Sequence, residues 1–230
     1  MLGHRNLLAW WRFESGTAAK DSSGNGRDLT TFNAPSTISG KFGMCFDNGT
    51  TDYSGSLIPC YGRYDDTALN LVNIPEGTIS GWFKSNINPD DKCEGISIRN
   101  TGGNNIRIYI GRSGTSGLLY TGLGSDTGND ITGCNFTVGV WNHVAITWTH
   151  NGLGGIGTAN TYWNGEYIQG NGFIVTNESN PSGLRCVIGG PYSRSDSRSW
   201  RGSIDEVMIW KMQLNAANIK RSMYMFHPIQ

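Results

Sequence analysis

The segment Asn105-Ile-Arg-Ile-Tyr-Ile-Gly111 alternates apolar and polar side chains with the two-residue period of a β-strand. Its three isoleucines fall on one side of an extended chain, because successive side chains of a strand point to opposite faces. Arg107 and Tyr109 fall on the other side. The pattern predicts a strand with one face in a core and the other toward solvent.

Further strands are predicted on both sides of this segment, at residues 7–13, 77–84, 141–148 and 202–210. Clusters of Gly, Asn, Asp and Ser separate them and are typical of turns. Between two more predicted strands, Asn164-Gly165 is the preferred dipeptide of a type I′ hairpin. The chain therefore reads as many short strands joined by tight turns.

The composition fits the same class, with 33 Gly, 11% aromatic and only 16% charged residues in 230. Asn215 is a good N-cap, and it predicts one short helical turn over residues 216–220. No Pro-rich or Ser-rich linker divides the strands. We therefore predict an all-β, two-sheet antiparallel sandwich in which residues 1–230 form one domain and 223–230 a C-terminal tail.

The charge balance argues against two classes of partner. The 18 basic and 18 acidic side chains give a formal net charge of zero, so no field gathers phosphates or anionic lipid, and we expect neither nucleic-acid binding nor membrane insertion. No apolar run approaches the roughly 18 residues of a membrane span. The first residues lack the apolar core of a signal peptide. The five cysteines, an odd number at irregular spacings, favour buried thiols and leave one or two disulfides open.

Seven short segments carry a family resemblance, and they occur in one order: Trp11-x-Phe13, Asp21-Ser-Ser-Gly-Asn-Gly26, Gly40-Lys-Phe-Gly43 with Phe46-Asp47, Ile79-Ser-Gly-Trp82, Trp141-Asn-His-Val-Ala145, Tyr162-Trp-Asn-Gly165 and Gly202-Ser-Ile-Asp-Glu-Val207. Together they resemble the laminin-G-like (concanavalin-A-like lectin/glucanase) modules. The resemblance runs from about residue 7 to about residue 222. It implies two antiparallel sheets stacked as a jelly roll and a role in recognising carbohydrate or protein.

The pair Asp205-Glu206 bears on catalysis. Glycosidases that share this fold carry a Glu-x-Asp-x-x-Glu array, and retaining chemistry needs two carboxyl groups about 5 Å apart. Here Ser203 precedes Asp205 by two positions, and Met208 and Ile209 stand where the last glutamate belongs. The sequence therefore predicts a protein that is not an enzyme, with a glycoside hydrolase or lyase of the same fold as the third alternative.

A structural interpretation of Asp205 involves a metal ion. By strand parity it shares the inward face with Val207 and Ile209, so its carboxylate needs a partner. The resemblance implies one structural calcium, for which the oxygen-rich turn 21–28 supplies further ligands. We expect Asp21, Asn25 and Asp205 to bind it. In the alternative, Asp205 accepts hydrogen bonds from backbone N–H groups of that turn.

Aromatic residues indicate where a ligand binds. Three of the eight tryptophans match framework positions of the resemblance, and the other five do not all fit in one core, so some of them mark a binding surface. The loop 191–201 adds rings beside guanidinium groups. We predict ligand contacts at Trp163, Tyr192, Arg194, Arg198 and Trp200.

The C-terminal segment 223–229 is apolar for a terminus and predicts either packing on the sandwich or docking onto a neighbouring subunit, which we favour. The predicted function is non-catalytic recognition or adhesion of a glycan or protein surface, as a decoration or fibre subunit of a phage-like virion. The protein would then be a homo-oligomer on a virion surface or in the extracellular space. The alternative is a carbohydrate-binding lectin module of a secreted enzyme.

Overall fold

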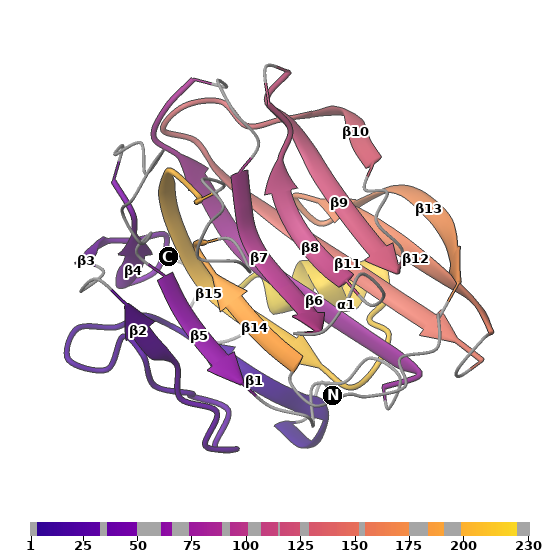
Figure 1. The fold of residues 1–230 in the computed structure, drawn as a ribbon, viewed down its shortest axis with the longest axis horizontal. Coiled ribbons are helices and arrows are strands. Elements are labelled where there is room, and N and C mark those ends of the chain that lie inside the picture. Colours follow the sequence, from indigo (N-terminus) through magenta and orange to yellow (C-terminus); the bar gives the residue numbers. More distant parts are fainter. Residues whose placement is uncertain are drawn as a thin grey trace.

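Two antiparallel β-sheets stack face to face in a computed structural model of the chain, which Figure 1 shows along its shortest axis. The structure describes residues 4–32, 36–49, 61–65, 74–88, 93–100, 107–114, 116–124, 129–151, 155–174, 184–190 and 199–224. Nearly all regular structure in these ranges is strand. The predicted two-sheet antiparallel sandwich is confirmed.

The larger sheet, called sheet A, is built around β15 (Gly202–Trp210). This strand pairs with β6 along one edge, and with β4 and β1 along the other. Segments from far apart in the sequence therefore lie side by side. The strand order of sheet A is β13 (Glu166–Ile174), β12 (Ile156–Trp163), β11 (Trp141–His150), β6 (Glu76–Ser85), β15, β4 (Met44–Asp47) and β3 (Ser36–Ser39), with β1 (Leu7–Trp11) paired to β15.

The second sheet, sheet B, contains the strand that was predicted from the alternation in residues 105–111. Ile110 in β8 is fully buried, as its alternation predicts, whereas Ile106 lies outside the described residues. A short 3₁₀ turn, η1 (His4–Asn6), precedes β1. The strand order of sheet B is β10 (Asn129–Asn135), β9 (Leu118–Gly124), β8 (Arg107–Arg112), β7 (Cys93–Asn100), β14 (Leu184–Ile188), β5 (Tyr61–Asp65) and β2 (Thr30–Phe32).

The main core lies between the sheets. Alternate side chains of facing strands enter it, among them Trp11, Phe83, Ile110, Trp148 and Val207, each at most 1% exposed. Burial of such large apolar side chains contributes about 1.5–3 kcal/mol each. This core fixes which face of every strand is left for other contacts.

A second apolar cluster covers part of the outer face of sheet A. The helix α1 (Ala216–Ser222) places Ile219 there, against Tyr162 and Trp210 of the sheet. The predicted N-cap is confirmed, because Asn215 Oδ1 accepts the N–H of Asn218 at 2.9 Å. Figure 1 shows α1 in yellow against sheet A. Among the described helices, none is long and apolar enough to cross a membrane.

The beginning of the C-terminal tail packs on its own sandwich. Met223 is 7% exposed, and the ring of Tyr224 meets Phe42 and Trp82 edge to face at centroid distances of 6.1 and 6.2 Å. Packing therefore describes residues 223 and 224 better than docking. Residues 225–230 lie outside the described residues, and docking through them stays a prediction.

Four cysteines are buried free thiols: Cys45, Cys93, Cys134 and Cys186. Burial raises the pKa of Cys186 to about 12 and that of Cys45 to about 11. Thiols held protonated in this way are poor nucleophiles. Cys60 lies outside the described residues.

Candidate functional site: an outer face of the larger sheet

The predicted calcium ligand Asp21 organises a turn against β1. Its Oδ1 accepts the backbone N–H groups of Trp10 and Ser23, both at 2.9 Å. Its Oδ2 accepts Ser23 Oγ–H at 2.8 Å and the N–H of Arg27 at 3.0 Å. Asn25 lies in the same turn and donates through Nδ2 to the carbonyl of Leu7 at 2.8 Å. The turn is thus pinned to β1 by side-chain hydrogen bonds.

Asp205 belongs to a different set of contacts. Its two carboxylate oxygens accept the N–H groups of Phe42, at 3.0 Å, and of Glu206, at 2.8 Å. The donors outside β15 thus come from the turn before β4, and not from residues 21–28 as the alternative interpretation had it. No hydrogen bond among the described residues joins Asp205 to Asp21 or Asn25.

The predicted inward orientation of Asp205 is wrong. Glu206 has φ of 50°, and the pairing of β15 with β6 shifts register between Asp205 and Met208. This bulge adds a residue, so Ile204 and Val207 both enter the inter-sheet core. Asp205 instead pairs with Trp82, whose ring lies on the outer face beside His143.

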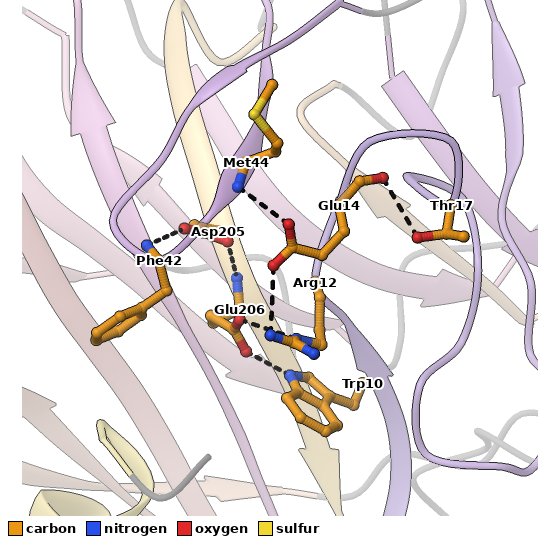
Figure 2. Close-up of polar contacts among 8 residues, drawn as sticks. All are labelled: Trp10, Arg12, Glu14, Thr17, Phe42, Met44, Asp205 and Glu206. Atoms are coloured by element: carbon orange, nitrogen blue, oxygen red, sulfur yellow. Dashed lines mark hydrogen bonds and ion pairs between the residues drawn. The ribbon is translucent and has the colours of Figure 1, made fainter. Parts of the chain in front are cut away.

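A chain of polar contacts ties β1, β15 and β4 together on this outer face, as Figure 2 shows. Glu206 accepts Trp10 Nε1–H at 2.5 Å and Arg12 Nε–H at 3.4 Å. Arg12 also donates to Glu14 Oε1 at 3.3 Å, and Glu14 Oε2 accepts the N–H of Met44 at 3.2 Å. The network explains why charged side chains are tolerated between packed strands.

The electrostatics of this network favour a structural role. The pKa of Asp205 is raised to about 8, mainly by burial and to a smaller extent by the nearby Glu206 carboxylate, while the N–H of Phe42 acts in the opposite direction. Asp205 is 0% exposed and Glu206 3% exposed. A substrate does not reach either carboxyl group in this arrangement, so we assign the pair to holding strands together.

The same contacts test how calcium would fit. The oxygens of Asp21 and Asp205 already serve N–H and O–H donors, and the described residues contain no cluster of three or more His, Cys, Asp or Glu side chains suited to a metal. Calcium instead needs six to eight oxygen ligands. The contacts support hydrogen bonding as the role of both carboxylates, and the calcium site stays a prediction.

Chelation tests that prediction. If calcium binds at these residues, EDTA should lower the Tm of the purified protein, whereas hydrogen bonds alone would leave the Tm unchanged. Differential scanning fluorimetry with EDTA and then with excess CaCl₂ measures this. A Tm that falls on chelation, recovers with calcium, and no longer responds in Asp21→Asn would establish the ion.

The structure describes two of the five predicted ligand-contacting residues, Trp163 and Trp200. Trp200 is 1% exposed, with its ring between Phe83 and Phe136, so its prediction as a ligand contact is wrong. Trp163 is half-buried, packs on Phe136 at 4.9 Å and faces the inter-sheet core. The remaining predicted residues, Tyr192, Arg194 and Arg198, lie outside the described residues.

The expectation that several tryptophans reach the surface fails for a related reason. It assumed one core, whereas sheet A is packed on both faces. Trp148 and Trp200 lie between the sheets, and Trp10 and Trp210 lie in the cluster under α1. All four are at most 6% exposed.

An exposed ring does exist on the outer face of sheet A, beyond α1. Tyr167 is 54% exposed and is the second residue of β13, just after the turn Asn164-Gly165. Both turn residues have positive φ, 52° and 84°, as a type I′ turn requires, which confirms the predicted hairpin. The ring of Tyr167 meets the buried Tyr162 edge to face at 5.7 Å. The ring is therefore held in place while much of its surface faces solvent.

A glycine makes room for this arrangement. A Cβ at Gly170 would lie 3.2 Å from the hydroxyl of Tyr167 and 2.7 Å from Asn160 Oδ1. The pairing of β12 with β13 shifts register between Thr161 and Tyr162. Because of this bulge, Tyr167 and Gly170 share the outer face although they are three positions apart.

The residues around the ring form a flat, uncharged strip. On β12 the outward positions alternate with Ala159, which enters the core. Across the strands, Thr158 pairs with Gly172 and Asn160 with Gly170. We call this strip the Tyr167 face, and it comprises Ile156, Thr158, Asn160, Tyr167, Gly170 and Gly172.

Sequence reasoning missed the Tyr167 face for a local reason. Strict alternation along β13 would place Tyr167 and Gly170 on opposite faces of the sheet. The residue types do not indicate the bulge that brings them to the same face. One signal was present in the residue types: threonine, asparagine and glycine are frequent in both strands that flank the predicted Asn164-Gly165 turn, and Tyr167 follows that turn.

Comparison with known proteins places the chain in a family. Residues 62–220 match the family model described as the concanavalin A-like lectin/glucanases superfamily. The chain belongs to that superfamily. This confirms the family that the sequence motifs indicated. Among curated protein sequences, none matches the chain closely enough to count as a relative.

Solved structures of this lectin/glucanase fold resemble the chain at low identity. Domain 4 of AbnA, a GH43 extracellular arabinanase from Geobacillus stearothermophilus in complex with arabinotriose, aligns with a TM-score of 0.67 at 19% identity over 94% of this chain and 98% of that one. The binding domain of Paraclostridial Mosquitocidal Protein 1 aligns at 0.68 and 17% identity, over 97% of this chain and 53% of that one.

A third similar structure is much longer than this chain. Trypanosoma rangeli sialidase, in complex with sialic acid, aligns with a TM-score of 0.69 at 14% identity over 96% of this chain. The alignment covers only 33% of the sialidase chain. At these identities the likeness to all three structures concerns the fold.

Proposed function

We propose that this superfamily member is a non-catalytic recognition protein that binds a glycan on its Tyr167 face. The observation that carries the proposal is the exposed ring of Tyr167, held against Tyr162, with Asn160 beside its hydroxyl and Thr158 further along β12. A sugar offers an apolar C–H face and hydroxyl edges. An exposed ring beside amide and hydroxyl groups complements both, as ligand sites combine aromatic surface with a few polar groups.

The similar structures support this proposal. One of them is a domain of an arabinanase in complex with arabinotriose, and it is matched over 98% of its length. Another is described as a binding domain. The buried state of Asp205 and Glu206 supports a role without catalysis by that pair.

The wider setting of the protein is also proposed. Exposed apolar side chains such as Ile156, at 72%, and Val140, at 47%, favour adhesion to a second surface. Such a surface would suit a decoration or fibre subunit of a virion, or a lectin module of a secreted enzyme. Localisation at a virion surface or outside the cell stays a prediction. The pairing of β1 with β15 supports one domain over residues 1–230.

Substitution of Tyr167 tests the glycan proposal. We expect Tyr167→Ala to weaken binding to the best ligand of a glycan array by about 30-fold, because removing an aromatic anchor costs about 2 kcal/mol or more. Tyr167→Phe keeps the stacking ring and should lose far less. Isothermal titration calorimetry on the array ligand measures both variants.

The matched control is Tyr224→Ala. Tyr224 is similarly exposed, at 45%, but packs beside Phe42 and Trp82 and is not part of the Tyr167 face. The Tyr224→Ala variant should bind the glycan with wild-type affinity. Wild-type affinity in Tyr167→Ala would contradict the proposal, and so would a wild-type protein that binds no glycan on the array.

A further inference from the structure

The shape and charge of the Tyr167 face indicate which glycans it takes, provided that the proposed function holds. The Tyr167 face lies on two hydrogen-bonded strands, β12 and β13. From Ile156 to Asn160 it extends along β12 for about 14 Å, since a strand rises about 3.4 Å per residue. Exposed apolar surface stands near both ends, at Ile156 and Tyr167, with Thr158 and Asn160 between them. Such a strip is longer than one sugar ring.

Gly172 keeps part of this strip open. Gly170 and Gly172 occupy successive outward positions of β13. Asn160 Oδ1 and the hydroxyl of Tyr167 fill the space over Gly170, so the open part of the strip lies over Gly172. Among the described residues, a Cβ built at Gly172 would meet nothing closer than the carbonyl oxygen of Gly157, at 3.9 Å. This open surface lies along the strands and borders the side chains of Asn160 and Tyr167.

The charges select against acidic sugars. The Tyr167 face contains no Lys or Arg. The described acids at its border are Glu76, which pairs with Thr149 beside Thr158, and Glu166, whose carboxylate meets Lys220 Nζ at 2.5 Å. Because Lys220 is already paired with Glu166, a sugar carboxylate on this face would lose hydration without gaining an unpaired cation. An uncharged sugar pays no such penalty.

We propose that the ligand is an uncharged oligosaccharide or polysaccharide chain that lies along β12 and β13, crosses Gly172, contacts the Asn160 amide and stacks one ring on Tyr167. The class is thus a neutral, extended glycan rather than a single terminal sugar or a sialylated or uronic-acid glycan. Gly172 sets the specificity, because its missing side chain is what leaves room for the chain.

Gly172→Val tests the path. Valine fits the empty space at Gly172 and suits a strand better than glycine, so the Tm should stay the same or rise. Its methyl groups would nevertheless project onto the path of the glycan. We expect binding of neutral arabino-, xylo-, cello- or malto-oligosaccharides, whichever the wild type prefers, to weaken by about tenfold or more. Titration calorimetry and fluorimetry give the two readouts.

The control variant is Ser39→Val. Ser39 is an exposed residue of β3, the opposite edge strand of sheet A, so it receives the same side chain away from the Tyr167 face. Unchanged affinity in Ser39→Val together with weakened affinity in Gly172→Val would support the proposed path.

The remaining outcomes separate this inference from the proposed function. Wild-type affinity in Gly172→Val, with binding lost in Tyr167→Ala, would overturn the path and leave glycan binding at Tyr167 intact. Preference for sialyllactose or oligogalacturonate over the neutral chains would overturn the neutral class. Absence of all glycan binding by the wild type would overturn both the proposed function and this inference.

Discussion

Trp200→Ala should lower the free energy of unfolding by about 3–5 kcal/mol, the usual cost of replacing a buried tryptophan or phenylalanine by alanine. Trp200 is 1% exposed, and its ring lies 5.6 Å from that of Phe83 and 5.1 Å from that of Phe136. Its Nε1–H also donates to the carbonyl of Lys84 at 3.3 Å. Alanine would leave a cavity between the sheets and an unused acceptor.

Urea unfolding followed by circular dichroism measures this loss. Trp200→Phe, which keeps most of the ring, should lose much less stability. Tyr167→Ala provides the contrast, because it removes an exposed ring and should leave the unfolding midpoint near that of the wild type. A Trp200→Ala variant with wild-type stability but without glycan binding would return Trp200 to the binding surface.

Above about pH 6.5 the protein should lose stability as the pH rises. Burial raises the pKa of Asp205 to about 8 in the folded protein, against an ordinary value of 3.8. Between these values the folded state holds one proton more than the unfolded state. The contribution of Asp205 to the free energy of unfolding is therefore fully present below about pH 4. It falls as the pH rises, by up to about 1.4 kcal/mol per pH unit, until about pH 8.

The titration of His143 offsets part of this pH dependence of stability. Burial lowers its pKa to about 3 from 6.5, so between those values the unfolded state binds the extra proton. Its contribution to stability therefore rises with pH from 3 to 6.5. From about pH 4 to 6.5 the two slopes oppose each other, and only the Asp205 slope continues above pH 6.5.

Two variants separate these slopes in urea unfolding between pH 4 and pH 9. Asp205→Asn should flatten the fall above pH 6.5, and His143→Gln should reveal a fall that begins near pH 4. Only the slopes matter, so a uniform loss of stability in either variant does not affect the comparison. An unchanged slope above pH 6.5 in Asp205→Asn would show that the carboxyl group is ionised in the folded protein.

The framework of the fold could be predicted from residue patterns because it depends on local rules. Alternation in residues 105–111 indicated β8, the Asn164-Gly165 dipeptide indicated the β12–β13 hairpin, and Asn215 indicated the start of α1. Each of these signals is contained in a few neighbouring residues. The order of seven short motifs along the chain indicated the superfamily.

The candidate site could not be predicted because it depends on two bulges. An added residue at Glu206 turns Asp205 to the outer face, and another in β13 brings Tyr167 and Gly170 together. A single extra residue reverses every later side chain of a strand, and a two-residue period does not reveal it. The cluster under α1 was missed because a helix can bury a second sheet face at a distance in sequence.

The central place of β15 constrains how the protein is made. On a ribosome, β1, β4 and β6 emerge long before their common partner, residues 202–210. Until then their hydrogen-bonding edges are unsatisfied, and nascent chains in that condition aggregate readily. Folding should therefore be completed late, after translation of β15, and its rate should be limited by closure of loops that span most of the polypeptide.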